Sequence, residues 1–465
     1  MSTAIKSSPL YRLSRDPDAL FGRSDEELLF LIKADFEDEL DRLLRAYSVG
    51  GVDDTRPSSR SPSVILYGQE YDEVNRTLTG LLTLKWTWNN QYDILVSNQV
   101  EALRLSRQSF DWMRHFYRES LSDPSYPDEL YALITSIVVN DIGKDDQLAL
   151  DYGKETGENI SAQNHDMILI KAVKKGLVKC LDPPNPRCLL SPEYIDAIIR
   201  GMELGAEFNF GQLAQAENAP ACLAGLTAMR GHAHSFRLRF EEQLLDIAGA
   251  AGHLDWTGAK KLTQSNFDAY RAVYDVGTGI ISRGLSLRAG YDLVLQRRLD
   301  LLIEKRFRPL DLNMEDDRAL ARLLCMGSVA DLTTAELYRS AWETLEDDVR
   351  NSLRKSLNID GSAAEPAVQV TYIPALITQA VDANGPKALD AKKRAMQSAL
   401  RYLCKVMSAP GKPNGPVSVI ERNVLPVLKR VVQSPEFRKD PAILEKAAIP
   451  DSLVAKMELA EQQPG

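Results

Sequence analysis

Histidine is used sparingly in this chain and only in one part of it. The five histidines among 465 residues all lie between His115 and His253. Three of them fall in two short polar segments, residues 164–166 (Asn-His-Asp) and 230–234 (Arg-Gly-His-Ala-His), and residues 139–146 upstream supply carboxylates. Because imidazole changes charge near neutral pH and is also a common metal ligand, these segments indicate one working region.

The segment that begins at Arg230 has the spacing of a helical face. Four residues would share one stripe of a continuous helix, at positions i, i+4, i+7 and i+11, namely Arg230, His234, Arg237 and Glu241. Two arginines beside a histidine could bind a phosphate or a carboxylate through paired N–H groups. An ordinary ion pair between Arg237 and Glu241 would explain the same spacing, so both interpretations stay open.

The carboxylate-rich segment follows a stretch of almost entirely apolar residues. Residues 130–139 predict a buried helix that ends beside Asp141. Gly143 is expected to free the backbone to turn there. The segment would then present Asp141 at the edge of a core, although a turn built from a glycine and a capping aspartate would look the same.

Residues 140–144 (Asn-Asp-Ile-Gly-Lys) resemble the His-Asp-Ile-Gly-Lys motif of the HD-domain superfamily of metal-dependent phosphohydrolases. The resemblance implies an all-α, multi-helical HD-like core. It also implies that Asp141, His165 and Asp246 take the places of metal-binding residues in that family.

The motif departs from the HD pattern at both remaining histidines. Asn140 stands where the family has the histidine of its His-Asp pair, and only Tyr92 or Asn98 is available for the upstream histidine. Too few strong ligands remain for a divalent cation. We therefore expect a degenerate HD-like fold without metal or other cofactor, with a working phosphohydrolase as the alternative.

Residues 164–166 have the composition of a helix start. Asp166 in a first turn would interact favourably with the helix dipole. His165 at the same position would serve as a base or a hydrogen-bond acceptor, unless both residues only stabilise the helix end.

Composition bounds the class of protein. The first residues lack the apolar run of a signal peptide, and no apolar stretch is long enough to span a bilayer. The five cysteines form no Cys-x-x-Cys pair, which favours a reducing compartment. We therefore expect a cytoplasmic protein with no membrane segment.

Charge is distributed unevenly along the chain. The net charge of −9 argues against a general nucleic-acid binder, yet residues 371–449 hold thirteen Lys or Arg and only six Asp or Glu. This basic region is either a solvated helical surface or a surface that faces the phosphates of an RNA partner.

Most of the chain has helical periodicity. Ser24 followed by Glu27 is a capping-box signature, and short β pieces are expected only near residues 64–67 and 367–372. Three regions are predicted: an N-terminal helix and linker (1–60), a helical core with the polar segments (61–310) and a C-terminal helical region (311–465). The later helices are expected at residues 192–206, 221–251, 266–306, 316–328, 333–357, 387–408 and 418–433.

Residues 226–274 resemble a second family. Their sequences Met-Arg-Gly-His-Ala-His-Ser-Phe-Arg (229–237) and Asp-Ile-Ala-Gly-Ala-Ala-Gly-His (246–253) look like those of fungal arginine-containing cyclodipeptide synthases of secondary metabolism. The resemblance implies an enzyme that joins arginine from arginyl-tRNA to a second aminoacyl group from another aminoacyl-tRNA, giving a 2,5-diketopiperazine. The chain has no Walker A, GxGxxG, GxSxG or HExxH motif, and an activated ester would make an ATP site unnecessary.

The implied reaction is aminolysis of an ester, which needs a base and a group that stabilises an oxyanion. His165 or His234 would act as the base, and Arg230 or Arg237 would stabilise the oxyanion. Asp141 is the third predicted catalytic residue. Carboxylates would hold the arginine side chain, with four candidates: Asp141, Asp145, Asp166 and Glu241. A non-catalytic helical binding protein remains the alternative if these segments lie far apart.

Overall fold

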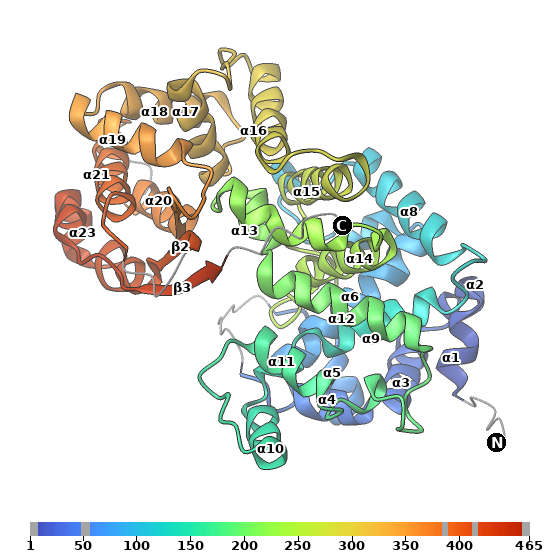
Figure 1. Ribbon diagram of the computed structural model, residues 1–465. Helices are drawn as coiled ribbons and strands as arrows, with labels where there is room; N and C mark the ends of the chain where they lie inside the picture. Colours follow the sequence, from blue (N-terminus) through green and yellow to red (C-terminus); the bar gives the residue numbers. More distant parts are fainter. Residues whose placement is uncertain (1–7, 48–55, 384–388, 412–416, 458–465) are drawn as a thin grey trace. The chain divides into compact units, whose positions relative to one another are not determined.

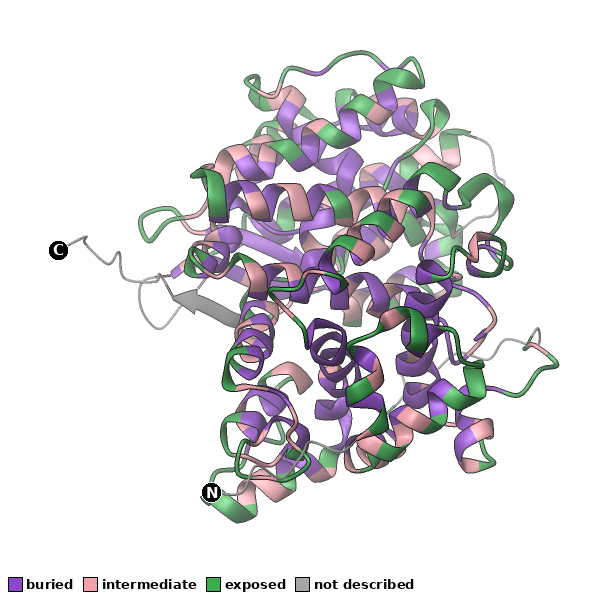
Figure 2. Ribbon diagram, turned by 90° about the vertical axis from the view of Figure 1, so that its right-hand side faces the viewer, coloured by how far each residue is buried: buried purple, intermediate pink, exposed green. Residues whose placement is uncertain are grey.

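The computed structural model describes residues 8–47, 56–383, 389–411 and 417–457. Helices make up most of these residues and one small sheet holds the strands (Figure 1), so the prediction of a mostly helical protein with short β pieces is confirmed. Most helices carry buried residues on one face and exposed residues on the other (Figure 2), as expected of amphipathic helices around a core. Among the described residues, no helix combines the length and the apolar character needed to cross a membrane.

The chain divides into two compact units. Unit 1 comprises residues 1–207 and 232–268, and unit 2 comprises residues 208–231 and 269–465. This division differs from the predicted boundaries at residues 60 and 310. The N-terminal helices belong to the core of unit 1, because Tyr11 donates a hydrogen bond to Asp128 (2.8 Å) and Tyr131 donates one to Asp35 (3.1 Å).

In the described part of unit 1, all regular elements are helices. They are α1 (Pro9–Ser14), α2 (Pro17–Phe21), α3 (Asp25–Asp35), α4 (Glu37–Leu43), α5 (Pro62–Tyr67), α6 (Asp72–Trp88), α7 (Tyr92–Leu95), η1 (Glu101–Leu103), α8 (Arg107–Leu121), α9 (Glu129–Asn140), η2 (Ile142–Lys144), α10 (Asp146–Thr156), α11 (His165–Lys174), η3 (Lys179–Leu181), α12 (Pro192–Glu207) and α14 (Ala233–Gly249). The next helix, α15 (Gln264–Arg283), begins in unit 1 and continues into unit 2. The capping box predicted at Ser24 is present at the start of α3.

The centre of unit 1 is formed by α6, α9 and α14. Helices α6 and α9 are buried along almost their whole lengths. Helix α14 crosses α6 at glycines: a β-carbon at Gly80 would lie 2.7 Å from the carbonyl oxygen of Leu245, and one at Gly249 would collide with that of Arg76. Helix α14 also packs against α9, and its polar residues lie beside both ends of that helix.

Unit 2 packs helices around a small sheet. Its elements are α13 (Phe210–Ala214), η4 (Pro220–Met229), α16 (Leu287–Glu304), α17 (Glu315–Met326), α18 (Leu332–Glu343), α19 (Asp347–Asn358), β1 (Ala367–Thr371), α20 (Ile373–Asp382), α21 (Leu389–Met407), β2 (Val417–Asn423), α22 (Leu425–Val427), the π-helix η5 (Leu428–Val432), α23 (Pro435–Lys439), η6 (Pro441–Lys446) and β3 (Ser452–Met457). Strands β1 and β2 are parallel, with Ala367 opposite Val419, and β3 runs antiparallel to β2. Helices α20 and α21 form the crossover that a parallel pair requires.

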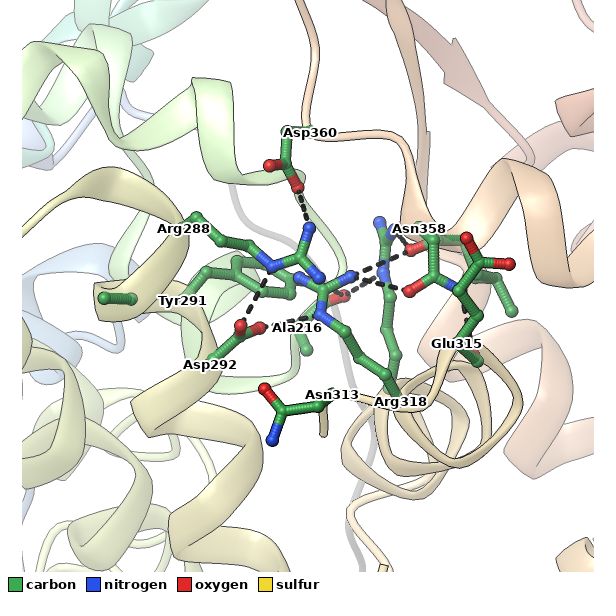
Figure 3. A network of polar contacts seen from close by, with 12 residues as sticks. Ala216, Arg288, Tyr291, Asp292, Asn313, Glu315, Arg318, Asn358 and Asp360 are labelled. Carbon is green, nitrogen blue, oxygen red and sulfur yellow. Dashed lines mark hydrogen bonds and ion pairs between the residues drawn. The ribbon is translucent and has the colours of Figure 1, made fainter. Parts of the chain in front are cut away.

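Buried arginines hold the helices of unit 2 together (Figure 3). Arg322 donates hydrogen bonds to the backbone carbonyl groups of Ala216 (3.2 Å), Asn218 (2.7 Å) and Leu357 (2.9 Å). Arg318 pairs with Asp292 at 2.7 Å. Since buried carbonyl groups need donors, these side chains fix an irregular segment of the chain against α17.

Several local predictions are wrong. Residues 64–67 are helical in α5, because the Ser61 side chain accepts the Val64 N–H (3.2 Å) and Pro62 occupies the first turn. The helix predicted over 418–433 begins instead as strand β2, whose residues alternate in burial and pair with β1. The helix predicted over 221–251 breaks at Gly231, which has φ +80°, so that η4 and α14 are separate.

Candidate functional site

Two clusters of buried polar residues in unit 1 contain the predicted site residues Asp141, His165 and His234, one cluster at each end of α9. The first, here called the Asp141 cluster, contains residues of α6, η2, α11 and α14 and the residue that follows α9. Its members are Glu73, Arg76, Asp141, Lys144, His165, Arg239, Glu242 and Asp246.

Lys144 is the central cation of the Asp141 cluster. Its Nζ donates a hydrogen bond to Glu73 (2.8 Å) and lies 2.9 Å from Asp141, while Arg76 pairs with Glu73 at 2.9 Å. Burial would raise the pKa of Asp141, but Lys144, Arg76 and His165 together hold it below its ordinary value. Asp141 therefore carries a negative charge that the protein itself neutralises.

Two further carboxyl groups complete this cluster from α14. Loss of solvation raises the pKa of Glu242 to about 8, although Arg239 opposes the rise through an ion pair. Loss of solvation and the charge of Asp141 raise the pKa of Asp246 to about 6. With Glu242 protonated, the remaining three carboxylates balance the three cations Arg76, Lys144 and Arg239.

The residues that the HD resemblance implied do come close to one another, but they do not fit a metal ion. His165 Nε2 lies 4.0 Å from Asp141 Oδ1, and Asp246 feels the charge of Asp141. However, Lys144 and Arg76 stand among these carboxylates, and a cation repels a second cation. Within the described residues, no group of three or more His, Cys, Asp or Glu side chains could hold a metal ion.

Two of the predicted substrate-binding residues have other partners. Asp145 pairs with Arg42 (3.1 Å) and Arg45 (2.8 Å) and accepts the N–H of Gln147, which caps α10. Asp166 lies in the first turn of α11, 3.6 Å from His165. Asp145 is therefore a structural residue that joins α4 to α10.

The second group, here called the His234 cluster, lies where α8, α9 and α14 meet. Its members are Tyr126, Glu129, His234, Arg237 and Glu241. His234 Nε2 forms a hydrogen bond of 2.7 Å with the Glu129 carboxylate, whose side chain is 0% exposed. The imidazole ring stacks on Tyr126 with 4.1 Å between ring centroids. The ring is thus fixed in orientation and its Nε2 is committed to a carboxylate.

Arg237 and Glu241 bring buried polar atoms that have no hydrogen-bond partner. Arg237 lies 3.8 Å from Glu129 Oε1, and its Nε and Nη2 atoms are buried without a partner. Both carboxylate oxygens of Glu241 are also buried without one. Burial, and then the charge of Glu129, raise the pKa of Glu241 to about 8. Unpaired buried polar groups are costly, and they mark places where a ligand can supply the missing partner.

Residues 29–444 match a protein family described as a family of unknown function (DUF6829). The chain belongs to this family. The match includes every residue of both clusters. No curated protein matches the chain, and no solved structure matches it.

In this DUF6829 member, the three predicted catalytic residues do not form one site. Asp141 and His165 are neighbours, but His234 contacts Glu129 at the opposite end of α9. Asp141 follows Glu129 by twelve positions along α9, which is roughly 18 Å at 1.5 Å per residue. Asp141 and His165 therefore belong to one cluster, and His234 belongs to the other.

The predicted stripe is also shorter than expected. Arg230 is exposed, precedes Gly231 and belongs to unit 2, so only His234, Arg237 and Glu241 share α14. The expected ion pair between Arg237 and Glu241 is replaced by the approach of Arg237 to Glu129.

Sequence reasoning missed Glu129 altogether. It lies in the first turn of α9, where an acidic residue is normally explained by the helix dipole. Only the packing of α14 against α9 reveals its hydrogen bond with His234.

Proposed function

We propose that this protein is a tRNA-dependent cyclodipeptide synthase that joins arginine from arginyl-tRNA to a second aminoacyl group, giving an arginine-containing 2,5-diketopiperazine. The observation that carries the proposal is the hydrogen-bonded pair of His234 and Glu129 beside Arg237. A base, an orienting carboxylate and a cation are the groups that acyl transfer uses.

His234 acts as the base in this proposal. If Nε2 carries the proton that is donated to Glu129, Nδ1 is free to accept a proton from the attacking α-amine. The amine nitrogen forms a bond with the ester carbonyl carbon, and the bond from that carbon to the ribose oxygen of the tRNA breaks. The proton passes from the imidazole to the leaving ribose oxygen, and a second, intramolecular attack closes the ring and releases the other tRNA.

Arg237 stabilises the oxyanion that forms on the carbonyl oxygen. Its Nε and Nη2 groups have no hydrogen-bond acceptor in the free protein. Donors that are held in place before the reaction stabilise a developing negative charge without reorganisation. Arg237 therefore takes the role for which Arg230 was the alternative candidate.

The Asp141 cluster does not favour the alternative of a metal-dependent phosphohydrolase. Lys144 and Arg76 already neutralise the carboxylates that would bind a metal ion. We assign this cluster to the stability of unit 1 and derive no catalytic step from it.

The C-terminal part of unit 2 offers positive charge for the tRNA backbone. Some of its basic residues are occupied within the protein, since Arg401 pairs with Glu346 and Glu445. Others are exposed, namely Lys429, Arg430, Arg438, Lys439 and Lys446. Binding through phosphates predicts an affinity that falls steeply with salt. The proposal also places the protein in the cytoplasm, where arginyl-tRNA is made.

The test is product formation by the intact chain and by two histidine variants. We expect the wild-type protein, expressed in a bacterial host or supplied with purified aminoacyl-tRNAs, to give cyclic dipeptides that contain arginine, detected by mass spectrometry. His234→Asn should lower the rate about 10²- to 10⁴-fold, which is the usual contribution of a general base.

His115→Asn is the matched control, because His115 has a side chain that is 81% exposed, and it should keep full activity. Soluble wild-type protein that makes no arginine-containing cyclic dipeptide from both charged tRNAs would overturn the proposal. Full activity of His234→Asn would overturn the assignment of the base.

A further inference from the structure

Glu241 differs from the other buried acidic residues of the chain. Among the residues that the structure describes, it is the one acidic side chain with both carboxylate oxygens buried and without a hydrogen-bond partner. Glu73, Asp141 and Glu242 are also buried, but each of them pairs with a lysine or an arginine. Glu241 is 0% exposed, so its carboxyl group is out of contact with bulk solvent.

The charge of the His234 cluster is incomplete when Glu241 is ionised. The cluster then contains two carboxylates, Glu129 and Glu241, and one cation, Arg237. With His234 uncharged, its net charge is −1. The neighbouring groups from α8 add no cation. The Tyr117 hydroxyl donates to the backbone carbonyl of Glu241 (2.9 Å). The Ser120 hydroxyl lies near the Glu241 carboxyl group and lowers its pKa, but its oxygen, like both Glu241 oxygens, is buried without a partner at hydrogen-bond geometry. With Glu241 protonated the cluster is neutral, and a further positive charge would balance the ionised form of Glu241.

We propose that Glu241 binds the guanidinium group of the arginyl substrate and thereby selects arginine. This inference rests on the proposed function. Two free oxygens on one carboxylate match the two parallel N–H groups of a guanidinium. A guanidinium also keeps its charge when it is removed from water, whereas burial lowers the pKa of an ammonium group. The site therefore favours arginine over lysine.

In this proposal the substrate reaches Glu241 past the segment between α8 and α9. Residues 122–128 are mostly exposed, and Tyr126 covers both His234 and Arg237 with its ring. Arg237 and His234 are among the charges that lower the pKa of Asp123, after the hydrogen bond from Ser125, which places this segment over the cluster. A substrate side chain that displaces Tyr126 would bring its ester toward His234.

Binding of a cation should be accompanied by proton release. The pKa of Glu241 is raised to about 8 in the free protein, so the group is mostly protonated at pH 7. A bound guanidinium stabilises the carboxylate and lowers this pKa, and nearly one proton then leaves per ligand. Glu129, Ser120 and Arg237 act on the same group and are present in both states.

The binding test uses the full-length protein and three amino-acid methyl esters as substrate mimics. Isothermal titration calorimetry at pH 7, in two buffers with different ionisation enthalpies, measures both affinity and proton release. We expect arginine methyl ester to bind at least about tenfold more tightly than lysine methyl ester or the uncharged citrulline methyl ester, with release of nearly one proton. Equal affinity for arginine and citrulline esters would overturn the inference.

Glu241→Gln is the decisive variant, and Glu119→Gln is its control, because Glu119 on α8 has a side chain that is 73% exposed. Glu241→Gln should lose the preference for arginine and the proton release, while Glu119→Gln keeps both. An unchanged melting temperature shows that the variant is folded. If Glu241→Gln is unfolded, Glu241→Asp replaces it, because aspartate keeps the carboxyl group on a shorter side chain. This variant should bind arginine methyl ester more weakly but still release a proton. Wild-type affinity of Glu241→Asp for arginine methyl ester would also overturn the inference.

Product analysis separates this inference from the proposed function. If wild-type protein makes arginine-containing cyclic dipeptides and Glu241→Gln makes them with unchanged KM for arginyl-tRNA, the inference fails and the proposed function stands. If arginine ester binds in a manner that depends on Glu241 but no cyclic dipeptide forms, the proposed function fails and a cation-binding site remains.

Discussion

The two polar clusters of unit 1 use the same two helices, α9 and α14, but differ in whether their buried carboxyl groups have partners. In the Asp141 cluster, Lys144 and Arg76 stand between the carboxylates. In the His234 cluster, Glu241 has two buried oxygens without a partner. A cluster whose carboxyl groups are paired with cations contributes to the folded structure, whereas one that leaves a buried carboxyl group without a partner is suited to a ligand that supplies it.

The comparison also shows why motif resemblance and site geometry point to different places. Residues 140–144 look like a metal-binding motif, yet the lysine at its end, Lys144, fills the space between Asp141 and Glu73. The residues of the His234 cluster match no short motif, but their burial and missing partners set them apart. The buried polar atoms without partners are therefore the basis of the proposed site, rather than the motif.

The strongest test of the comparison removes Lys144, the central cation of the Asp141 cluster. Lys144→Met would leave Glu73 and Asp141 buried with one cation fewer, and breaking a buried ion pair typically costs about 3–5 kcal/mol. We expect the free energy of unfolding, measured by urea denaturation with circular dichroism, to fall by that amount. Lys154→Met, at a side chain that is 70% exposed, should change stability by less than about 0.5 kcal/mol. Wild-type stability in Lys144→Met would contradict the structural role of this cluster.

A second test concerns the approach of η2 to α11. A β-carbon at Gly143 would collide with the backbone carbonyl of His165, so Gly143→Ala should push the two segments apart. We expect a loss of about 3 kcal/mol in unfolding free energy, at the upper end of what overpacking costs. Gly153→Ala in α10 is the control, because the nearest atom to a β-carbon there is 3.3 Å away. It should lower the unfolding free energy far less than Gly143→Ala does. If Gly143→Ala has the unfolding free energy of wild type, η2 can move without disturbing Asp141.

The third test follows from the raised pKa of Glu241. Its pKa is about 8 in the folded protein and about 4.3 in an unfolded chain, so the folded state holds more protons between these values. The contribution of this group to stability is therefore fully present below about pH 4 and is lost as pH rises toward 8. Between pH 6 and 8.5 the loss is on the order of 2 kcal/mol.

Glu241→Gln should remove this part of the pH dependence, so that the variant gains stability relative to wild type as pH rises. Unfolding free energies at pH 6, 7 and 8.5 measure the effect, and Glu119→Gln should follow the wild-type curve. A Glu241→Gln curve parallel to that of wild type would indicate that the carboxyl group is already ionised and compensated.

The smallest expected effect distinguishes the two candidate bases. His165 lies beside Asp141 in the compensated cluster, so His165→Asn should lower the rate of product formation by less than about threefold, compared with the much larger loss for His234→Asn. Steady-state rates with saturating aminoacyl-tRNA measure the difference. The reverse order of the two variants would move the proposed active site to the Asp141 cluster.

Local signals in the sequence predicted part of the molecule well. Ser24 does cap α3, the apolar residues 130–139 do form a buried helix, and a strand does begin near Ala367. These features depend on residues within a few positions of each other, such as a capping side chain and the N–H groups three residues later. The closeness of Asp141 and His165 was also expected, from the HD resemblance.

Features that depend on distant partners were predicted less well. Gly143 was expected to free a turn, but it serves the close contact with His165, which lies in another helix. Strand β2 was expected to be helical, and its hydrogen bonds with β1 come from a segment about 50 residues away along the chain. The helix before Arg230 was expected to continue, and its end at Gly231 removed Arg230 from the stripe.

The sequence by itself determined that the chain is mostly helical and that its histidines concentrate in one unit, because helix signals and composition are local properties. Only the tertiary structure decided which of those histidines has a carboxylate partner and which acid is left without one. His234 meets Glu129, and Lys144 meets Asp141 and Glu73, through the packing of α14 and α6 around α9. Whether a buried charge is compensated depends on atoms a few ångströms away in space, and these belong to segments far apart in the chain.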